Sequence, residues 1–223
     1  MNIKKEGISI QKTKIEWTEY SWNPITGCKH GCWYCYARKL ATRFPKVFPN
    51  GFEPTFYPER LKEPYELKKP SKIFVCSIAD LFAPWTPFMW RVQVLEAIEK
   101  CPIRHTFQLL TKNPELIYDY EFPENVWVGA TVTDYWERRK INDLREVNAK
   151  VRFVSFEPLL SNFPDLDLYG IQWVIIGKLT GSRKGKIEKW WVEDLIQKAR
   201  SQNIPIFVKN NVSWPVKIQE FPK

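Results

Sequence analysis

Several features are missing from this 223-residue sequence, and each absence narrows the class of protein. No apolar run approaches the roughly 18 residues that a membrane-spanning helix needs. The polar start of the chain is not followed by the apolar segment of a secretory signal. No internal repeat, low-complexity tract or Gly/Ser linker divides the chain. We therefore expect one cytoplasmic domain over residues 1–223, with a loose lead-in at 1–14 and a covering segment at 45–70 that is rich in proline and aromatic residues.

Cysteine is scarce and odd in number, which argues against a disulfide framework. Three of the five cysteines, Cys28, Cys32 and Cys35, form a C-x3-C-x2-C run within eight positions. A reduced compartment and a bound metal fit this spacing better than disulfides. Three thiolates suit three irons of a [4Fe–4S] cluster and leave the fourth iron open. Zinc, with His30 or a distant cysteine as fourth ligand, stays open as an alternative.

Acidic residues are outnumbered by basic ones. The chain has 34 Lys and Arg against 25 Asp and Glu, for a net charge of +9 and a pI near 9.2. A Lys-rich proteome would explain this balance, and so would a polyanionic partner such as RNA or DNA. Charge alone does not decide between the two.

Apolar strand patterns alternate with amphipathic helix patterns along most of the chain. Such alternation is typical of βαβ units and a parallel sheet. About seven parallel strands predict a partial or nearly closed (β/α)6-7 TIM-like barrel. The expected strands are 15–17 with 21–26, 72–78, 106–110, 126–132, 151–156, 173–176 and 204–208, and the expected helices are 35–44, 59–67, 87–100, 135–147 and 189–201.

Polar residues follow the predicted strands at the ends where barrel enzymes carry their chemistry. We expect them to converge on one mouth together with the cysteines. They are Ser77 and Asp80, Thr111 and Lys112 with Asn113, Thr131 with Thr133 and Asp134, Glu157, Lys178 with Thr180, and Lys209 with Asn210.

The cysteine run and a series of longer phrases resemble known families. C-x3-C followed by C-x-aromatic-C, with Tyr34 as the aromatic residue, is similar to the signature of the radical S-adenosylmethionine (SAM) superfamily. The whole stretch 14–222 resembles the phage Gp37/Gp68 family, also called DUF5131. The phrases that carry this second resemblance are KIEWT (14–18), SWNPITGC (21–28), PERL (58–61), SIADLF (77–82), QLLTK (108–112), SFEPLL (155–160) and FVK (207–209).

The resemblance implies a cofactor pair and a reaction type. It implies a [4Fe–4S] cluster on the three cysteines and SAM on the open iron, cleaved after one-electron reduction to a 5′-deoxyadenosyl radical. An electron donor such as ferredoxin or flavodoxin would supply the electron. On this basis Tyr34 faces the adenine, and Glu157 contacts the amino or ribose hydroxyl groups of SAM, with a salt bridge to a neighbouring lysine as the alternative. Lys209 is expected to point inward, near Glu157 or a SAM carboxylate. The full cofactor-binding set expected is Tyr34, Ser77, Asp80, Thr111, Lys112, Glu157 and Lys209.

One corner of the chain departs from the family pattern. Where the family tends to read Gly-Gly-Glu-Ser-Gly, this chain has GKLTG at 177–181, followed by a basic loop. We expect Lys178, Arg183, Lys184 and Lys186 to bind an anionic substrate.

Three functions therefore stay open at this stage. The first is a radical SAM enzyme that modifies or repairs a nucleic acid or nucleotide. The second is an iron–sulfur or zinc protein that binds nucleic acid without cleaving SAM. The third is a radical SAM enzyme that acts on a small molecule or peptide.

Overall fold

The computed structural model describes residues 10–180 and 187–223, and the chain divides into two compact units, Met1–Leu109 and Leu110–Lys223. The expectation of a single domain stays a prediction.

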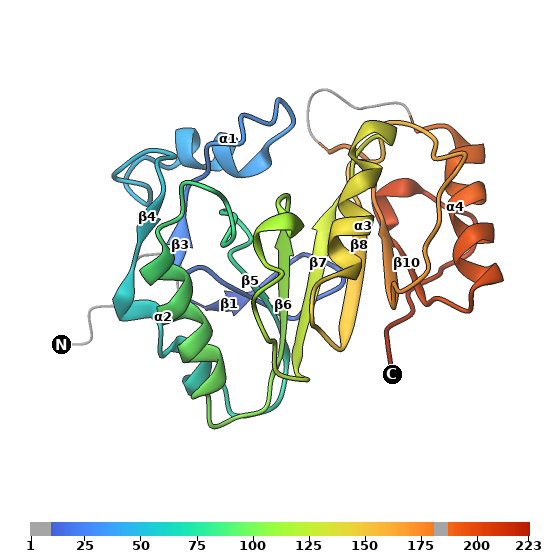
Figure 1. Cartoon of the computed structure of the whole chain (residues 1–223). Helices are drawn as coiled ribbons and strands as arrows, with labels where there is room; N and C mark the ends of the chain where they lie inside the picture. Colours follow the sequence, from blue (N-terminus) through green and yellow to red (C-terminus); the bar gives the residue numbers. More distant parts are fainter. Residues whose placement is uncertain (1–9, 181–186) are drawn as a thin grey trace. The chain divides into compact units, whose positions relative to one another are not determined.

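The larger sheet of the first unit has short strands (Figure 1). β2 (Tyr20–Trp22) pairs in parallel with β5 (Lys72–Val75), and β5 pairs in parallel with β6 (Thr106–Thr111). β1 (Gln11–Lys12) adds an antiparallel edge to β2, so this part of the expected lead-in is a strand. Ile73 and Val75 of β5 are buried, as an almost wholly apolar parallel strand requires.

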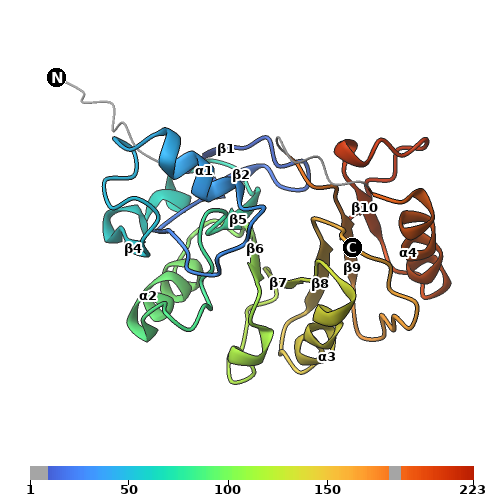
Figure 2. The same ribbon diagram turned by 90° about the horizontal axis from the view of Figure 1, so that it is seen from above.

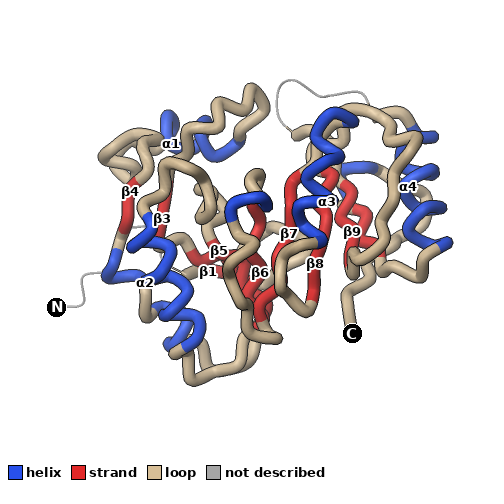
Figure 3. Tube along the Cα trace, viewed as in Figure 1, coloured by secondary structure: helices blue, strands red, loops and turns tan. Residues whose placement is uncertain are grey.

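A second, two-stranded sheet lies next to the cysteine run in sequence. β3 (Ile25–Thr26) pairs antiparallel with β4 (Thr55–Phe56) (Figure 3). The sequence predicts one strand over 21–26, but β2 and β3 are separate because Pro24 lies between them and has no N–H to donate to a ladder. The strand predicted at 15–17 is wrong: the chain turns there, and strand pairing resumes only at Tyr20.

From Ile10 to Leu109, the first unit also contains two helices and two 3-10 turns. They are α1 (Tyr36–Arg43), α2 (Phe88–Glu99), η1 (Pro58–Arg60) and η2 (Glu63–Glu66). The expected helix at 59–67 is wrong: two separate turns stand there, and Pro64 cannot donate the hydrogen bond that a longer helix needs.

Residues 45–70 pack against both helices of this unit. Phe48 is buried in a cluster with Ala37 and Ala41 of α1. Phe56 stacks on Trp90 of α2 with ring centroids 5.4 Å apart. The Tyr65 hydroxyl donates to the carbonyl of Ala97 at 3.0 Å. Aromatic side chains therefore anchor a stretch that has little regular structure.

The second unit is built on four parallel strands in the order β7-β8-β9-β10. Their bounds are β7 (Val126–Thr131), β8 (Val151–Phe156), β9 (Trp173–Ile176) and β10 (Ile206–Val208). α3 (Arg139–Arg145) runs along β7 and β8, and α4 (Lys189–Ser201) lies outside β9 and β10 (Figure 2). The short turns are η3 (Pro114–Leu116), η4 (Tyr135–Arg138) and η5 (Asn210–Val212).

The core of the second unit lies between strands and helices. All four residues of β9 are fully buried, and Trp173 packs edge-on against Trp127 and Phe207. The helix predicted at 135–147 is shorter than expected: Asp134 caps a 3-10 turn, and α3 begins only at Arg139. The helix predicted at 189–201 has the bounds of α4.

Strands that alternate with helices and pair mainly in parallel make this a mixed α/β fold, as predicted. Within the described residues, no helix has both the length and the apolar character to span a membrane.

Candidate functional site

The cysteine loop begins at Gly27, and any other residue at this position would force the neighbouring backbone to move. Gly27 has a φ of +84°, and a Cβ placed there would lie 2.2 Å from the carbonyl oxygen of Glu53. The Gly27 N–H donates to the carbonyl of Ile78 at 3.2 Å, and the Cys28 N–H donates to that of Phe52 at 3.1 Å. The loop is therefore held on one side by the turn after β5 and on the other by the segment that leads to β4.

The three cysteines lie between this anchor and the first turn of α1. Cys35 is the N-cap of α1, and its Sγ accepts from the N–H of Arg38 at 3.4 Å. The Arg38 guanidinium in turn donates to the carbonyl of Cys28 at 3.0 Å. The N–H of Cys35 donates to the carbonyl of Cys32 at 3.1 Å. All three cysteines are free thiols and only partly buried, so none is sealed inside the core.

Cys28 is costly to ionise. Burial is the main cause that raises the pKa of Cys28 to about 11; the nearby Asp80, Cys32 and Cys35 act in the same direction, and the hydrogen bond from the His30 N–H acts against them. Thiolates next to one another need a cation to offset their repulsion. Cys76 is fully buried, and burial raises its pKa to about 12, as is expected of an inert structural cysteine.

The metal site expected at the cysteine loop stays a prediction. Within residues 10–180 and 187–223, no three His, Cys, Asp or Glu side chains are grouped to hold one metal ion. His30, the fourth ligand considered for zinc, has its Nε2 within 2.9 Å of Asp80 Oδ2. Cys28, Cys32 and Cys35 supply three thiol donors, which is the number that the predicted [4Fe–4S] cluster would take from the protein.

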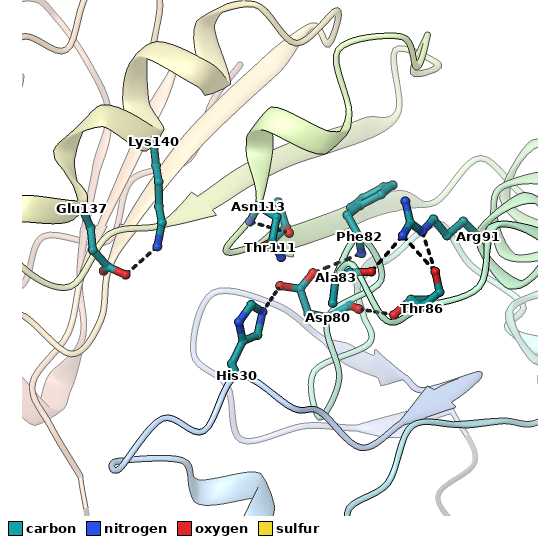
Figure 4. A network of polar contacts seen from close by, with 10 residues as sticks. All are labelled: His30, Asp80, Phe82, Ala83, Thr86, Arg91, Thr111, Asn113, Glu137 and Lys140. Atoms are coloured by element: carbon teal, nitrogen blue, oxygen red, sulfur yellow. Dashed lines mark hydrogen bonds and ion pairs between the residues drawn. The ribbon is translucent and has the colours of Figure 1, made fainter.

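Asp80 ties the turn after β5 to the cysteine loop (Figure 4). Its Oδ1 accepts from the Phe82 N–H at 3.1 Å, while Oδ2 faces His30. Its backbone carbonyl accepts from the Thr86 hydroxyl at 3.0 Å. Asp80 is only 5% exposed, and the His30 ring stands edge-on to Trp85 at 4.6 Å. This arrangement fixes the middle of the cysteine loop.

Ser77 is held by a buried residue that the sequence did not single out. Its hydroxyl donates to Asn23 Oδ1 at 3.2 Å, and that oxygen also accepts from the Ile78 N–H. The Tyr36 hydroxyl donates to the Ser77 carbonyl at 2.6 Å. Asn23 is 2% exposed. The signal that the sequence offered for it was an Asn directly before a proline. Tyr34 lies partly buried, with its ring edge-on to Trp33 at 5.4 Å.

In the second unit, Glu157 and Lys209 form an ion pair between residues that directly follow β8 and β10. Both side chains are largely buried. Gly177, directly after β9, makes this possible because a Cβ there would lie 2.8 Å from the carboxyl carbon of Glu157. The N–H of Lys178 donates to Asn211 Oδ1 at 3.2 Å, and Asn211 Nδ2 donates back to the Lys178 carbonyl at 2.9 Å. Three neighbouring strand ends thus meet, as the parallel sheet predicted.

A second polar cluster of this unit includes a glutamate that sequence reasoning missed. Glu137 Oε2 accepts from both the N–H and the hydroxyl of Thr133 at 2.7 Å, and Oε1 accepts from Lys140 at 2.5 Å (Figure 4). Burial acts to raise the pKa of Glu137, but hydrogen bonds from Lys140 and Thr133 and the charge of Lys112 lower it to about 2. Its place within a predicted helix made it look like an ordinary acidic residue of a first turn.

The remaining predicted residues divide by unit. Thr111 is buried, and its hydroxyl accepts from the Asn113 N–H at 3.0 Å. Thus the first unit carries the cysteines with Tyr34, Ser77 and Asp80, and the second carries the other cofactor candidates and Lys178. Arg183, Lys184 and Lys186 lie outside the described residues.

Solved structures of spore photoproduct lyase share this fold. One is a double mutant with bound AdoMet and dinucleoside spore photoproduct, at a TM-score of 0.52 and 11% identity, covering 87% of this chain and 65% of that one. Another is a complex with dinucleoside spore photoproduct, at a TM-score of 0.51 and 11% identity, covering 86% and 64%. The chain thus spans slightly less than two thirds of the length of these neighbours.

A family model matches almost the whole sequence. Residues 12–220 match the family described as "Protein of unknown function (DUF5131)", and the chain belongs to that family. The resemblance drawn from the sequence phrases is thereby confirmed. No curated protein matches the chain.

Proposed function

We propose that this protein is a radical SAM enzyme that modifies or repairs a nucleic acid or nucleotide. The observation that carries the proposal is the cysteine loop: three free, partly buried thiols on one loop after β3, next to the turn that follows a parallel strand. A site at the carboxyl end of parallel strands is where α/β barrels hold their reactive groups.

The fold supports the same reading. Spore photoproduct lyase, with which this chain shares its fold, has been solved with bound AdoMet and a dinucleoside lesion. At 11% identity this likeness concerns the fold, so the cofactor and substrate of this chain are proposals that rest on its own residues.

In the first unit, each residue has a proposed task that its contacts make possible. Cys28, Cys32 and Cys35 would hold the [4Fe–4S] cluster, and the His30–Asp80 pair would keep the loop in shape. Tyr34 would offer its ring to the adenine of SAM, and Ser77 a polar backbone edge. When bound, the cluster supplies the electron that cleaves SAM and releases a 5′-deoxyadenosyl radical.

In the second unit, the proposal assigns cofactor contacts to Glu157, Lys209, Thr111 and Lys112. Glu157 is a partly buried acceptor suited to amino or ribose hydroxyl groups, and Lys209 is a partly buried donor suited to a carboxylate. The two neutralise each other, which lowers the cost of keeping both charges partly buried.

The substrate class rests on charge. A net charge of +9 favours a polyanion, and Lys178 with Arg183, Lys184 and Lys186 would bind its phosphates. We expect affinity for a single-stranded oligonucleotide to fall steeply with salt, and charge-neutral variants of Lys184 and Lys186 to reduce the slope. Flat or undetectable binding at low salt would favour a small-molecule or peptide substrate.

The cofactor proposal is tested by anaerobic reconstitution. The full chain is supplied with iron and sulfide, reduced with dithionite and given SAM, and 5′-deoxyadenosine is measured by mass spectrometry. We expect four irons per chain and product formation. Replacing Cys28, Cys32 or Cys35 by Ala should abolish the visible chromophore, whereas Cys101→Ala, the matched control from the same unit, should retain it.

Two outcomes would contradict the proposal in different ways. If all three cysteine variants keep four irons, the ligand assignment is wrong. If the wild-type chain holds a full cluster but forms no 5′-deoxyadenosine, the protein is an iron–sulfur protein that does not cleave SAM.

A further inference from the structure

The outer face of α1 is apolar, exposed and next to the cysteine loop. Tyr36, Leu40 and Phe44 recur at four-residue spacing and are 48%, 37% and 45% exposed. Trp33, between Cys32 and Cys35, adds a side chain that is 54% exposed. Grouped apolar side chains on a surface mark interaction sites more often than single ones do. The adjoining side of the helix carries Ala37 and Ala41, which are buried against Phe48.

The same face is basic. Lys39 and Arg43 are exposed and lie three residues after Tyr36 and Leu40, so they share the face with them. The Arg43 guanidinium lies 5.4 Å from the centroid of the Phe44 ring. No Asp or Glu occurs between Tyr20 and Phe52, a stretch with five Lys and Arg. A partner for this face should therefore be acidic, with an apolar centre.

The face is also close in sequence and space to the proposed cluster. Cys35 caps the helix through its own Sγ, and Trp33 stands between two of the three ligands. A group that exchanges single electrons needs a protein surface near it where a donor can bind briefly. Interfaces of that kind are small and weak, and opposite charges speed the encounter.

We propose that the outer face of α1, defined by Trp33, Tyr36, Leu40 and Phe44 with Lys39 and Arg43, is the docking surface for an acidic one-electron redox protein. The inference rests on the proposed function, because the partner's electron is the one that the cluster requires. A nucleic acid could also stack on exposed aromatic rings. The redox protein is favoured because Trp33 and the Cys35 cap place this face beside the proposed cluster, which exchanges single electrons.

The test compares a protein donor with a small one. Cluster reduction in the reconstituted full chain is followed by bleaching of the visible band, with reduced flavodoxin or with dithionite. In the double variant Lys39→Glu/Arg43→Glu we expect reduction by flavodoxin to slow at least about tenfold at low salt, since rim charges govern association. Reduction by dithionite, iron content and dithionite-driven 5′-deoxyadenosine should not change.

A matched control comes from the same unit. Lys68 and Lys69 are exposed and lie just before the start of β5. The turn that contacts the cysteine loop follows the other end of this strand. Lys68→Glu/Lys69→Glu makes the same change in net charge and should leave the flavodoxin rate near that of the wild type. The conservative pair Lys39→Arg/Arg43→Lys should also retain it.

Binding of oxidised flavodoxin to the chain before reconstitution is measured in parallel by calorimetry. Weaker flavodoxin binding by the Lys39→Glu/Arg43→Glu variant, but not by the control, would support the proposed docking surface even if no cluster assembles. Failure of the proposed function can therefore be distinguished from failure of the docking proposal. Equal flavodoxin binding and reduction in all variants would overturn the inference. Loss of affinity for a single-stranded oligonucleotide, with flavodoxin unaffected, would assign the surface to nucleic acid instead.

Discussion

Replacing Gly27 by alanine should lower the stability of the protein more than replacing a glycine that has a positive φ but no close neighbour. Two costs apply at Gly27. An L-residue at a positive φ costs about 1 kcal/mol. In addition, the new Cβ would lie 2.2 Å from the Glu53 carbonyl oxygen, and backbone must move to relieve that overlap, at about 2 kcal/mol. We expect Gly27→Ala to lower the free energy of unfolding by about 3 kcal/mol.

Gly51 provides the control for this prediction. It has a φ of +61°, but a Cβ there would meet no atom within 4 Å. Gly51→Ala should therefore cost only the conformational term, about 1 kcal/mol. For a chain of this size, about 1 kcal/mol corresponds to roughly 3 °C in Tm, so we expect losses of about 9 °C and about 3 °C.

The assay is thermal unfolding by circular dichroism, together with iron content after reconstitution. Gly27→Ala should also lose iron, because the Cys28 N–H would part from the Phe52 carbonyl. Equal Tm values for the two variants would refute the reasoning. So would a Gly27→Ala chain that is destabilised as expected but binds the full four irons.

Three further predictions concern stability. Glu137→Gln should lower the free energy of unfolding by about 2 kcal/mol at neutral pH, because a charged hydrogen-bond acceptor is lost. The pKa of Glu137 in the folded protein is about 2, below the ordinary 4.5, so the difference from wild type should be full above pH 4.5 and should fade as the pH falls toward 2. Urea titrations at several pH values measure this difference. Trp22→Phe removes the indole N–H that donates to the Arg60 carbonyl at 2.8 Å within the core, and we expect urea midpoints to report a loss of about 2 kcal/mol. Trp136→Phe, at a side chain 80% exposed, should change stability by less than about 0.5 kcal/mol, and a larger loss would mean that exposure does not predict the cost.

The periodic elements could be predicted because their signals are local. α4 repeats apolar residues at helical spacing, and β9 is a short apolar run with buried faces on both sides. Local signals also misled: a β-rich stretch at 21–26 concealed the break that Pro24 makes between β2 and β3.

The site was predictable in composition but not in its contacts. The strand-end rule selected Glu157 and Lys209 and gave two expected partners for Lys209, Glu157 or a SAM carboxylate; the structure pairs it with Glu157 across 52 positions. Gly177 matters because the Glu157 side chain lies close to it, and Glu137 matters because Thr133 donates hydrogen bonds to it. Both effects depend on tertiary packing. Such contacts leave no spacing pattern in the sequence.

The two carbonyls that hold the cysteine loop come from distant parts of the chain, Phe52 and Ile78. A peptide that copies residues 27–36 has every thiol but neither anchor. If the proposed cluster forms, its assembly has an order: residues 45–78 must fold before the loop has the shape that would receive a metal. Cluster insertion would then be a late step that requires a folded first unit, and the C-x3-C-x2-C run by itself would not be enough for it.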